Sequence, residues 1–583
     1  MKTFQNDRGY ALFTTVIVIV LFGLLSMTLL SLTIAGAKKS AIREEATQAH
    51  ELADKGIDHI TQQINAELEN ALGTNGLSRS AFEAKLLEIL GKYLCENMKV
   101  SPINTEQGDY EVCIESFTSI DGEENSLRKL VNFYSTGISG DQNKSVNTYV
   151  EIGSKSVPEV LKYTVGSNIR SNNPRNGEGN LLLHGGVDIH GDVRVDGHLV
   201  TYERGVGSYR WINSIQPRMY EIISGVRPRI VVGKNMYRMN QNPYSGATES
   251  NHTKYLNNDN FSINRYSMTT NTQDLFDDGY APVAVKRNPQ KEKIQIKEHK
   301  SNFYYNQNSG ATRVNVGTNR TFSGYTTNAQ RVVPYYESCA WFGGCTNVYN
   351  GEIIFQNTNK FKSLALGGGG HFKRGNHSFQ DGLYVGGKLK IGNLSQTDHS
   401  SNRDNITIDG TMYVDGDLQI QGANLTSNAM MYVDGDVEIR FSSIQGKDLG
   451  NGDTGTLIIF ATGNIFLANN SVHQDNPTHI KGYFYSEKNM EIYGVGSNIH
   501  IDGGIAGNRV VLNAVRGRVT NGSRSNSTYV QGVGYVDNVT NQRVRNSRLT
   551  IKYDTELIEN FLKLNPPEPV IYNVDPPELI SRE

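Results

Sequence analysis

The feature that most constrains this chain is the stretch between Arg8 and Lys38, which holds no charged residue. A helix needs about 20 apolar residues to cross a bilayer, so the stretch predicts a transmembrane helix over residues 10–37, from Tyr10 to Ala37. A cleaved secretory signal is the rival, because Ala35-Gly36-Ala37 has the small residues of a cleavage site. Its apolar part would be far longer than the usual run of about 7–15 residues, which favours the membrane span.

The segment after the span carries an apolar stripe at helical spacing. The stripe recurs at steps of three or four residues through Ile42, Ala46, Ala49, Ala53, Ile57, Ile60, Ile64, Leu68 and Leu72. This period predicts an amphipathic helix with a charged opposite face. No proline or turn cluster separates it from the span. We therefore predict one long helix, half in the bilayer and half outside, in which Gly56 is a tolerated weak point.

The order of the N-terminal features points to a family. A short basic leader ends in Gly9 and is followed by the aromatic Tyr10, the apolar span and the amphipathic helix. With its Arg8-Gly9-Tyr10-Ala11-Leu12 start and the later run Gln48-Ala49-His50-Glu51-Leu52-Ala53-Asp54-Lys55-Gly56-Ile57, this region resembles type IV prepilins and pseudopilins. It looks most like the N-terminal domain of PilX-like pilus assembly proteins.

The resemblance implies several properties of the chain. Residues 1–9 would be a leader, cut between Gly9 and Tyr10 by prepilin peptidase, and the new amino terminus would be methylated. The protein would sit in the cell membrane as a single-pass protein with its C-terminal part outside, in contact with lipid and with other pilin or pseudopilin subunits. Major pilins carry Glu at the fifth mature position, where this chain has Thr14. This departure favours a minor, tip or initiating subunit, and a plain single-pass anchor stays open as the alternative.

Residues 38–160 are predicted to form the helix extension and a small α+β pilin-like head. Ser80 can cap a helix over 81–90 whose apolar residues share one face. Short alternating segments at 110–117, 130–135 and 146–152, each bounded by turn residues, predict strands.

The four cysteines fall into two local pairs, Cys95 with Cys113 and Cys339 with Cys345. On an exported chain this spacing predicts two disulfides, and four reduced, buried thiols are the alternative. Neither pair has the spacing of a zinc site, and we expect no metal or cofactor.

The C-terminal half repeats a short apolar frame around Gly and Asp. It reads Val414-Asp415-Gly416-Asp417-Leu418-Gln419-Ile420 and recurs, with the third residue of each copy at Gly387, Gly416, Gly435, Gly463, Lys488 and Asn508, in steps of 29, 19, 28, 25 and 20. A recurring step of this size predicts one coil of stacked parallel strands with Gly at the corners. Antiparallel hairpins are the rival, because Asp-Gly also marks hairpin turns.

These elements together predict a multidomain fold class, α+β and all-β. The C-terminal part of the chain is expected to be a right-handed parallel β-solenoid that loosely resembles bactofilins. First solenoid coils are expected at 161–201 and the main solenoid at 361–550. A polar, loop-rich insertion at 202–360 has exposed Tyr and Asn suited to a glycan or surface ligand, although a merely decorative insertion is the plainer interpretation. A capping helix and Pro-rich tail are expected at 551–583.

Candidate chemistry is sparse. Asp415 and Asp417 lie one coil from Asp434 and Asp436, as paired acids of a polysaccharide-active β-helix would, but Asp is common in such turns for conformational reasons. His184, His190 and His198 match no zinc motif. A formal net charge of −2 disfavours nucleic-acid binding.

We therefore predict no catalytic residue and no enzyme activity. The leading function is a membrane-anchored minor pilin-like subunit of a type IV pilus or competence-type pseudopilus, which displays the solenoid for filament assembly or adhesion. The alternatives are an anchored surface adhesin that never enters a filament and an anchored β-helix polysaccharide-active enzyme.

Overall fold

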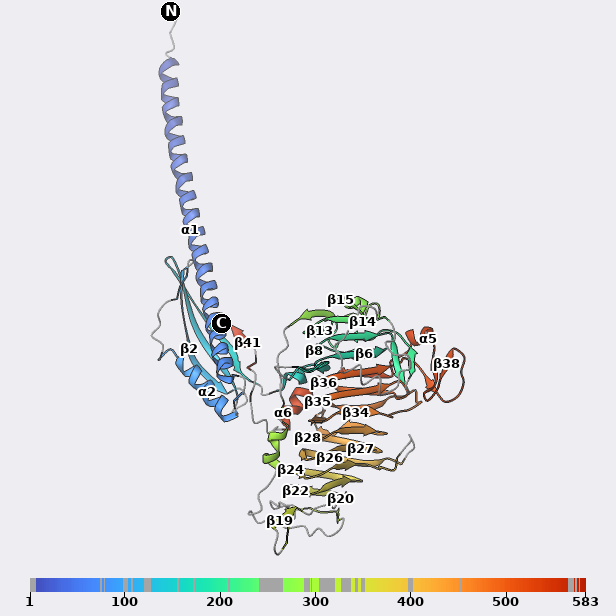
Figure 1. Ribbon diagram of the computed structural model, residues 1–583. Coiled ribbons are helices and arrows are strands. Elements are labelled where there is room, and N and C mark those ends of the chain that lie inside the picture. Colours follow the sequence, from blue (N-terminus) through green and yellow to red (C-terminus); the bar gives the residue numbers. More distant parts are fainter. Residues whose placement is uncertain are drawn as a thin grey trace, which may run out of the picture. The chain divides into compact units, whose positions relative to one another are not determined.

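One long helix and a large set of parallel strands dominate the computed structural model of the protein (Figure 1). The chain divides into two units, Met1–Ser156 with Val570–Glu583, and Val157–Pro569. The structure describes residues 7–582 except for 74–75, 78, 98–102, 106–107, 120–126, 155–156, 171–173, 208–209, 241–265, 288–293, 295, 304–319, 327–336, 341–343, 348–351, 397–401, 451, 565–570, 572–573 and 576.

Helix α1 spans Asp7–Leu72 without a break, so the prediction of one continuous helix is confirmed. Its first half exposes apolar side chains, whereas the predicted stripe becomes buried from Ala49 onward. Ile42, at the start of the stripe, is still 40% exposed. The stripe therefore identified the packed face, and the point where packing starts is set by the length of the adjoining sheet.

The first unit packs α1 and α2 (Arg79–Lys92) on an antiparallel sheet ordered β1-β2-β3-β4-β41. Its strands are β1 (Ile103–Thr105), β2 (Gly108–Ser119), β3 (Arg128–Ser139), β4 (Gln142–Gly153) and β41 (Glu578–Arg582). A helix and three strands are found where they were predicted, and a disulfide joins Cys95 to Cys113. The predicted cap is wrong, because α2 starts at Arg79 and Ser80 lies within the helix. Strand β41 was not predicted, and it pairs with β4. In the sequence, the second unit is therefore inserted between two strands that are neighbours in this sheet.

The second unit stacks parallel strands around an apolar interior. One row consists of β24 (Gly375–Val385), β26 (Asp404–Val414), β28 (Ala423–Val433), β33 (Leu457–Ala461), β35 (Thr478–Gly494) and β36 (Ile499–Ala514), each paired in parallel with the next. A second row consists of β25 (Leu389–Ile391), β27 (Leu418–Gln421), β29 (Val437–Arg440) and β34 (Ile465–Ala468). Equivalent residues of the repeated frame lie in register and are buried, as in the column Val385, Val414, Val433 and Ala461.

The stack continues into a much earlier part of the chain. After β36 come β5 (Val165–Ser167), β6 (Leu181–Gly185) and β40 (Leu549–Tyr553). Next are β7 (Asp188–His190), β8 (Val193–Val195) and β9 (Leu199–Tyr202), and then β12 (Arg218–Tyr220), β13 (Arg229–Val232), β14 (Met236–Met239) and β16 (Val283–Lys286). The end near β24 holds β20 (Glu352–Gln356), β23 (Gly369–Phe372) and β17 (Arg320–Ser323). The order of strands in the stack is therefore not their order in the chain.

The predicted fold class is wrong. The protein is mostly β-sheet with one long N-terminal helix, and its parallel strands do not form a clear right-handed solenoid. The repeated frame describes how one strand registers on its neighbour. It carries no information on the handedness of the stack or on which distant strands pair. Any strand edge with the same alternation of apolar residues can accept a parallel partner.

An aromatic row on the outside of the stack is covered by short helices. Tyr384, Tyr413, Tyr432, Phe460 and Tyr485 stand in register on successive strands. They are buried beneath α4 (Lys300–Phe303), α6 (Leu557–Lys563) and the turn η1 (Glu159–Lys162). Parts of 202–360 thus join the fold, as strands β12, β13, β14, β16, β17 and β20 and as the segment around α4.

Candidate functional site

The N-terminal half of α1 exposes a continuous run of apolar side chains. Large apolar side chains from Leu12 to Ile34 are between 41% exposed (Ile17) and 73% exposed (Met27). Among the described residues, α1 is the helix long and apolar enough to cross a membrane. Contiguous apolar exposure of this extent marks contact with lipid or with another protein.

Three threonine hydroxyls in this half of α1 are satisfied within the helix. The hydroxyls of Thr15, Thr28 and Thr33 donate to backbone carbonyls of Leu12, Leu24 and Leu29 at 2.8, 2.7 and 2.8 Å. Such internal bonds remove the cost of placing hydroxyls in an apolar medium. The surface therefore suits burial in lipid.

The predicted processing residues lie at the start of this helix. Gly9 and Tyr10 fall in the first turns of α1, and Ala37 lies in its interior. Met1–Asn6 and the side chain of Tyr10 lie outside the described residues, so cleavage and the limits of the span stay predictions.

The other half of α1 is fixed to the head by apolar packing and a few polar contacts. The Ser139 hydroxyl donates to Oε1 of Gln48 at 3.0 Å, and the Tyr110 hydroxyl lies 3.1 Å from Nδ1 of His59. The Tyr93 hydroxyl donates to the Glu67 carboxylate. Burial, and to a smaller extent this hydrogen bond, raises the pKa of Tyr93. These bonds add polar contacts between α1 and the rest of the first unit.

The second predicted cysteine pair also aligns in the backbone. Cys339 and Cys345 are register partners in the antiparallel hairpin of β18 (Glu337–Ala340) and β19 (Gly344–Asn347). Their side chains lie outside the described residues, and this disulfide stays a prediction.

The aspartates of the repeated turns tie one strand layer to the next. The Asp417 carboxylate accepts a bond from the Asp436 backbone N–H at 3.0 Å, and Asp436 accepts one from the Asn464 N–H at 2.6 Å. The Asn464 side chain in turn accepts from the Asn489 N–H at 3.3 Å. These residues therefore have a structural role, since each satisfies a backbone donor of the following turn.

Asp415 and Asp434 are held by lysines of the segment around α4. Nζ of Lys297 lies 3.0 Å from the Asp434 carboxylate, which also accepts from the Thr462 hydroxyl at 2.8 Å. Asp415 is paired with Lys300 and accepts from the Tyr384 hydroxyl at 3.1 Å. The two acids thus anchor this segment over the aromatic row.

A groove of about 890 Å³ runs along these turns. Its walls mix Asp417, Asp434, Asp436 and Glu487 with Arg170, Arg175, Lys297 and Lys488. Arg170 pairs with Glu487 at 2.5 Å across it. A glycosidase site needs one acid held in its protonated form opposite a second. The acids described here are instead engaged by cations or backbone donors.

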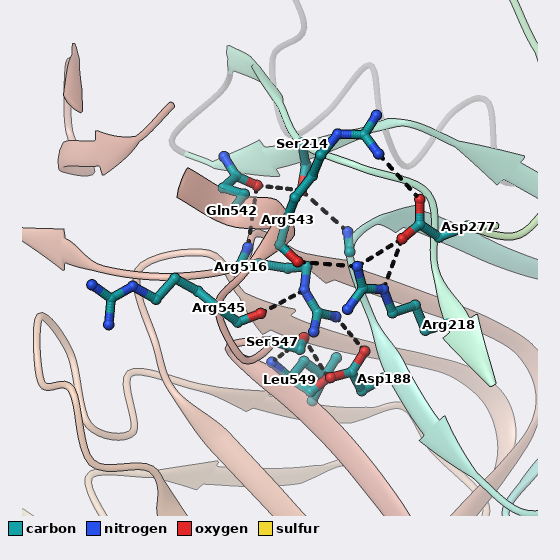
Figure 2. A network of polar contacts seen from close by, with 11 residues as sticks. Asp188, Ser214, Arg218, Asp277, Arg516, Gln542, Arg543, Arg545, Ser547 and Leu549 are labelled. Carbon is teal, nitrogen blue, oxygen red and sulfur yellow. Dashed lines mark hydrogen bonds and ion pairs between the residues drawn. The ribbon is translucent and has the colours of Figure 1, made fainter. Parts of the chain in front are cut away.

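A second groove, of about 460 Å³, overlies a buried polar network where early and late strands meet (Figure 2). Arg516 pairs with Asp188 of β7, and its Nε donates to the Arg545 carbonyl at 2.8 Å. Arg218 of β12 pairs with Asp277 at 2.7 Å and donates to the Arg543 carbonyl at 3.1 Å. Burial raises the pKa of Asp188, against the opposing effect of Arg516. The Arg516–Asp188 pair is buried and its polar atoms are bonded, so it can fix how the early and late strands align. We therefore assign it a structural role at this junction.

The three histidines that were considered and not predicted to bind zinc have separate partners. His184 packs edge-on against Trp211, His190 stacks on Tyr220 at 4.5 Å, and the His198 ring accepts from the Asn235 N–H at 3.2 Å. A different group, His479, His500 and Asp502, was not predicted from the sequence; the register of β35 on β36 brings these residues to one face. The separation of the two histidines, close to one repeat step, was the available signal.

Comparisons with known proteins are sparse. No family model matches the sequence, and no curated protein matches it. Among solved structures the chain is similar to the competence-associated pilin ComZ from Thermus thermophilus, at 11% identity and a TM-score of 0.24, over 92% of this chain and 97% of that chain. So low a TM-score establishes no shared fold. The functional case rests on the chain's own features.

Proposed function

We propose that the protein is a membrane-anchored minor pilin-like subunit of a type IV pilus or competence-type pseudopilus. In this proposal α1 anchors the protein in the membrane and packs among other subunits when the protein enters a filament. The second unit is displayed outside the cell for filament assembly or adhesion. The observation that carries it is the division of one unbroken helix into an exposed apolar half and a half buried in an antiparallel head.

The sequence at the start of the exposed half supports a processed pilin-like subunit rather than a plain single-pass anchor. It follows a leader that ends in Gly9, and no acidic residue occurs between Arg8 and Lys38. Thr14 at the fifth mature position supplies no carboxylate for a neighbouring amino terminus, which suits a minor or tip position. We also propose a non-enzymatic role, supported by the structural bonds of Asp415, Asp417, Asp434 and Asp436.

Mass spectrometry of the N-terminal peptide, on protein purified from membranes and from sheared surface filaments, tests the proposal. We expect a mature chain that begins at methylated Tyr10 and is present in the filament fraction. Gly9→Val should leave the leader in place and remove the protein from filaments, because the scissile bond follows Gly9.

Ala37→Leu is the matched control, since it disturbs only the rival signal-peptidase site. It should leave the start at Tyr10 unchanged. A mature chain that begins at Lys38 would identify a secreted protein, and an intact Met1 would identify a plain anchored adhesin. Either result would overturn the proposal.

A further inference from the structure

We infer that His479, His500 and Asp502 form a binding site for a divalent transition-metal ion such as Zn²⁺ on the outer face of the parallel stack. This inference is independent of the proposed pilin role. The three residues lie on β35 and β36, which are neighbouring strands of the second unit (Figure 1).

The strand register creates the group. His479 is the direct parallel partner of His500, and Asp502 follows His500 by two residues. Alternate residues of a strand share a face, so all three side chains project to the same side. Ile480 and Ile501, between them in sequence, are fully buried in the interior. The three polar side chains therefore point outward from a fixed backbone.

The distances fit a shared ion. Nε2 of His500 lies 3.1 Å from Oδ1 of Asp502, and Nδ1 of His479 lies 3.9 Å from Oδ2. All three ligand atoms lie within 4.8 Å of one another. An ion about 2.1 Å from each ligand atom holds those atoms at most about 4.2 Å apart. A small rotation of the exposed His479 ring closes the remaining gap.

The ligand set selects the class of metal. Two imidazole nitrogens and one carboxylate oxygen suit Zn²⁺, Co²⁺ or Ni²⁺ better than Ca²⁺ or Mg²⁺, which prefer oxygen ligands. The imidazole rings stack with centroids 5.0 Å apart. Three protein ligands at an accessible surface leave coordination positions for water or for a group from another molecule.

Neighbouring charges set the strength of the site. Lys481 and Lys552 flank Asp502 in register on the two adjacent strands, and like charge opposes a cation. Lys481 is itself balanced by Asp554 at 3.4 Å and Glu556 at 3.6 Å. We therefore expect moderate affinity, lower than that of a closed structural zinc site.

Calorimetric titration of the detergent-solubilised full chain, without a histidine tag, with ZnCl₂ tests the inference. The wild-type chain should bind one Zn²⁺, and His479→Ala and Asp502→Ala should each weaken binding at least about tenfold. All three side chains reach solvent, so these variants should keep the wild-type thermal unfolding curve. Co²⁺ loading should give a visible d–d absorption that both variants lose.

His50→Ala is the matched control, because it removes an exposed histidine of α1 outside the group. It should bind Zn²⁺ as the wild type does. Absence of Zn²⁺ binding by the wild type would overturn the inference, and so would binding that is unchanged in His479→Ala and Asp502→Ala.

Discussion

At the scale of single residues, His377 shows how a buried imidazole is held neutral. It lies among Phe355 and Phe372 with 1% of its surface exposed. Its Nε2 lies 3.2 Å from the Arg374 carbonyl, and Asn359 Nδ2 lies 3.3 Å from its Nδ1. The carbonyl requires Nε2 to donate, so Nδ1 must accept from the amide. A second proton on Nδ1 would face the amide donor.

This environment predicts a pH-dependent stability of the second unit. Burial lowers the pKa of His377 from 6.5 to about 4. The unfolded chain therefore takes up a proton between these values while the folded chain does not, and stability falls as the pH drops from about 6.5 to about 4. The loss is at most roughly 3 kcal/mol from this residue. Urea unfolding followed by circular dichroism across this range measures it.

Two variants isolate the contribution of His377. His377→Gln should have a lower free energy of unfolding than the wild type at neutral pH. Its free energy of unfolding should fall less on acidification, because Gln does not titrate. Some slope should remain, since burial also lowers the pKa of His190 to about 4. His50→Gln, at an exposed site, should behave as the wild type. An equal slope in wild type and His377→Gln would exclude His377 as a source of the pH dependence.

At the scale of elements, the α1 stripe was predictable because helical period alone determines which residues share a face. How closely the sheet approaches α1 was not predictable. Gly56, expected to be a weak point of the helix, lies against Tyr110 and Ser135, where an added Cβ would come within 2.8 Å of each. Ala49, Ala53 and Gly56 let the sheet approach α1 closely, and only the folded arrangement reveals why these positions are small.

Gly137 of β3 gives a test of this close packing. A Cβ there would lie 1.9 Å from the Ala49 carbonyl oxygen and 2.6 Å from the Ala53 nitrogen, both backbone atoms of α1. Gly137→Ala should therefore push β3 from α1 and destabilise the first unit by about 1–3 kcal/mol. Thermal unfolding of the full chain, followed by hydrogen exchange in β3, measures the effect.

Gly91→Ala in α2 is the matched control. An added Cβ there meets no atom within 4 Å, and Ala favours a helix over Gly by up to about 1 kcal/mol. This variant should be neutral or slightly more stable. If Gly137→Ala behaved in the same way, the close contact between β3 and α1 would be refuted.

At the scale of the whole molecule, the sequence repeat predicted the layers but not the path of the chain. The frames at Val414 and Val433 lie in register as their pattern requires. The contact of β36 with β5 and β6 joins segments separated by more than 300 residues, and no period connects them. Buried Arg516 and Asp188 hold a neighbouring part of this junction, and neither belongs to a recognisable motif.

The end of the chain was the other feature hidden from the sequence. Its Pro-rich composition predicts an extended tail, yet this tail returns to the first unit. Leu77 and Ile571 exchange backbone bonds at 3.0 and 2.6 Å, and the Asp575 N–H donates to the Gly153 carbonyl at 2.9 Å. Ile571 is 3% exposed and belongs to the core of the unit.

Removal of residues 570–583 should therefore weaken the first unit and leave the second intact. Loss of β41 uncovers the edge of β4, and loss of Ile571 removes a buried side chain worth on the order of 2–4 kcal/mol. Hydrogen exchange should become faster at Leu77 and along β4, while β26 and β28, in the second unit, should keep their wild-type protection. Unchanged exchange at Leu77 would show that the tail does not complete the sheet, whereas faster exchange in both units would show that their stabilities are coupled.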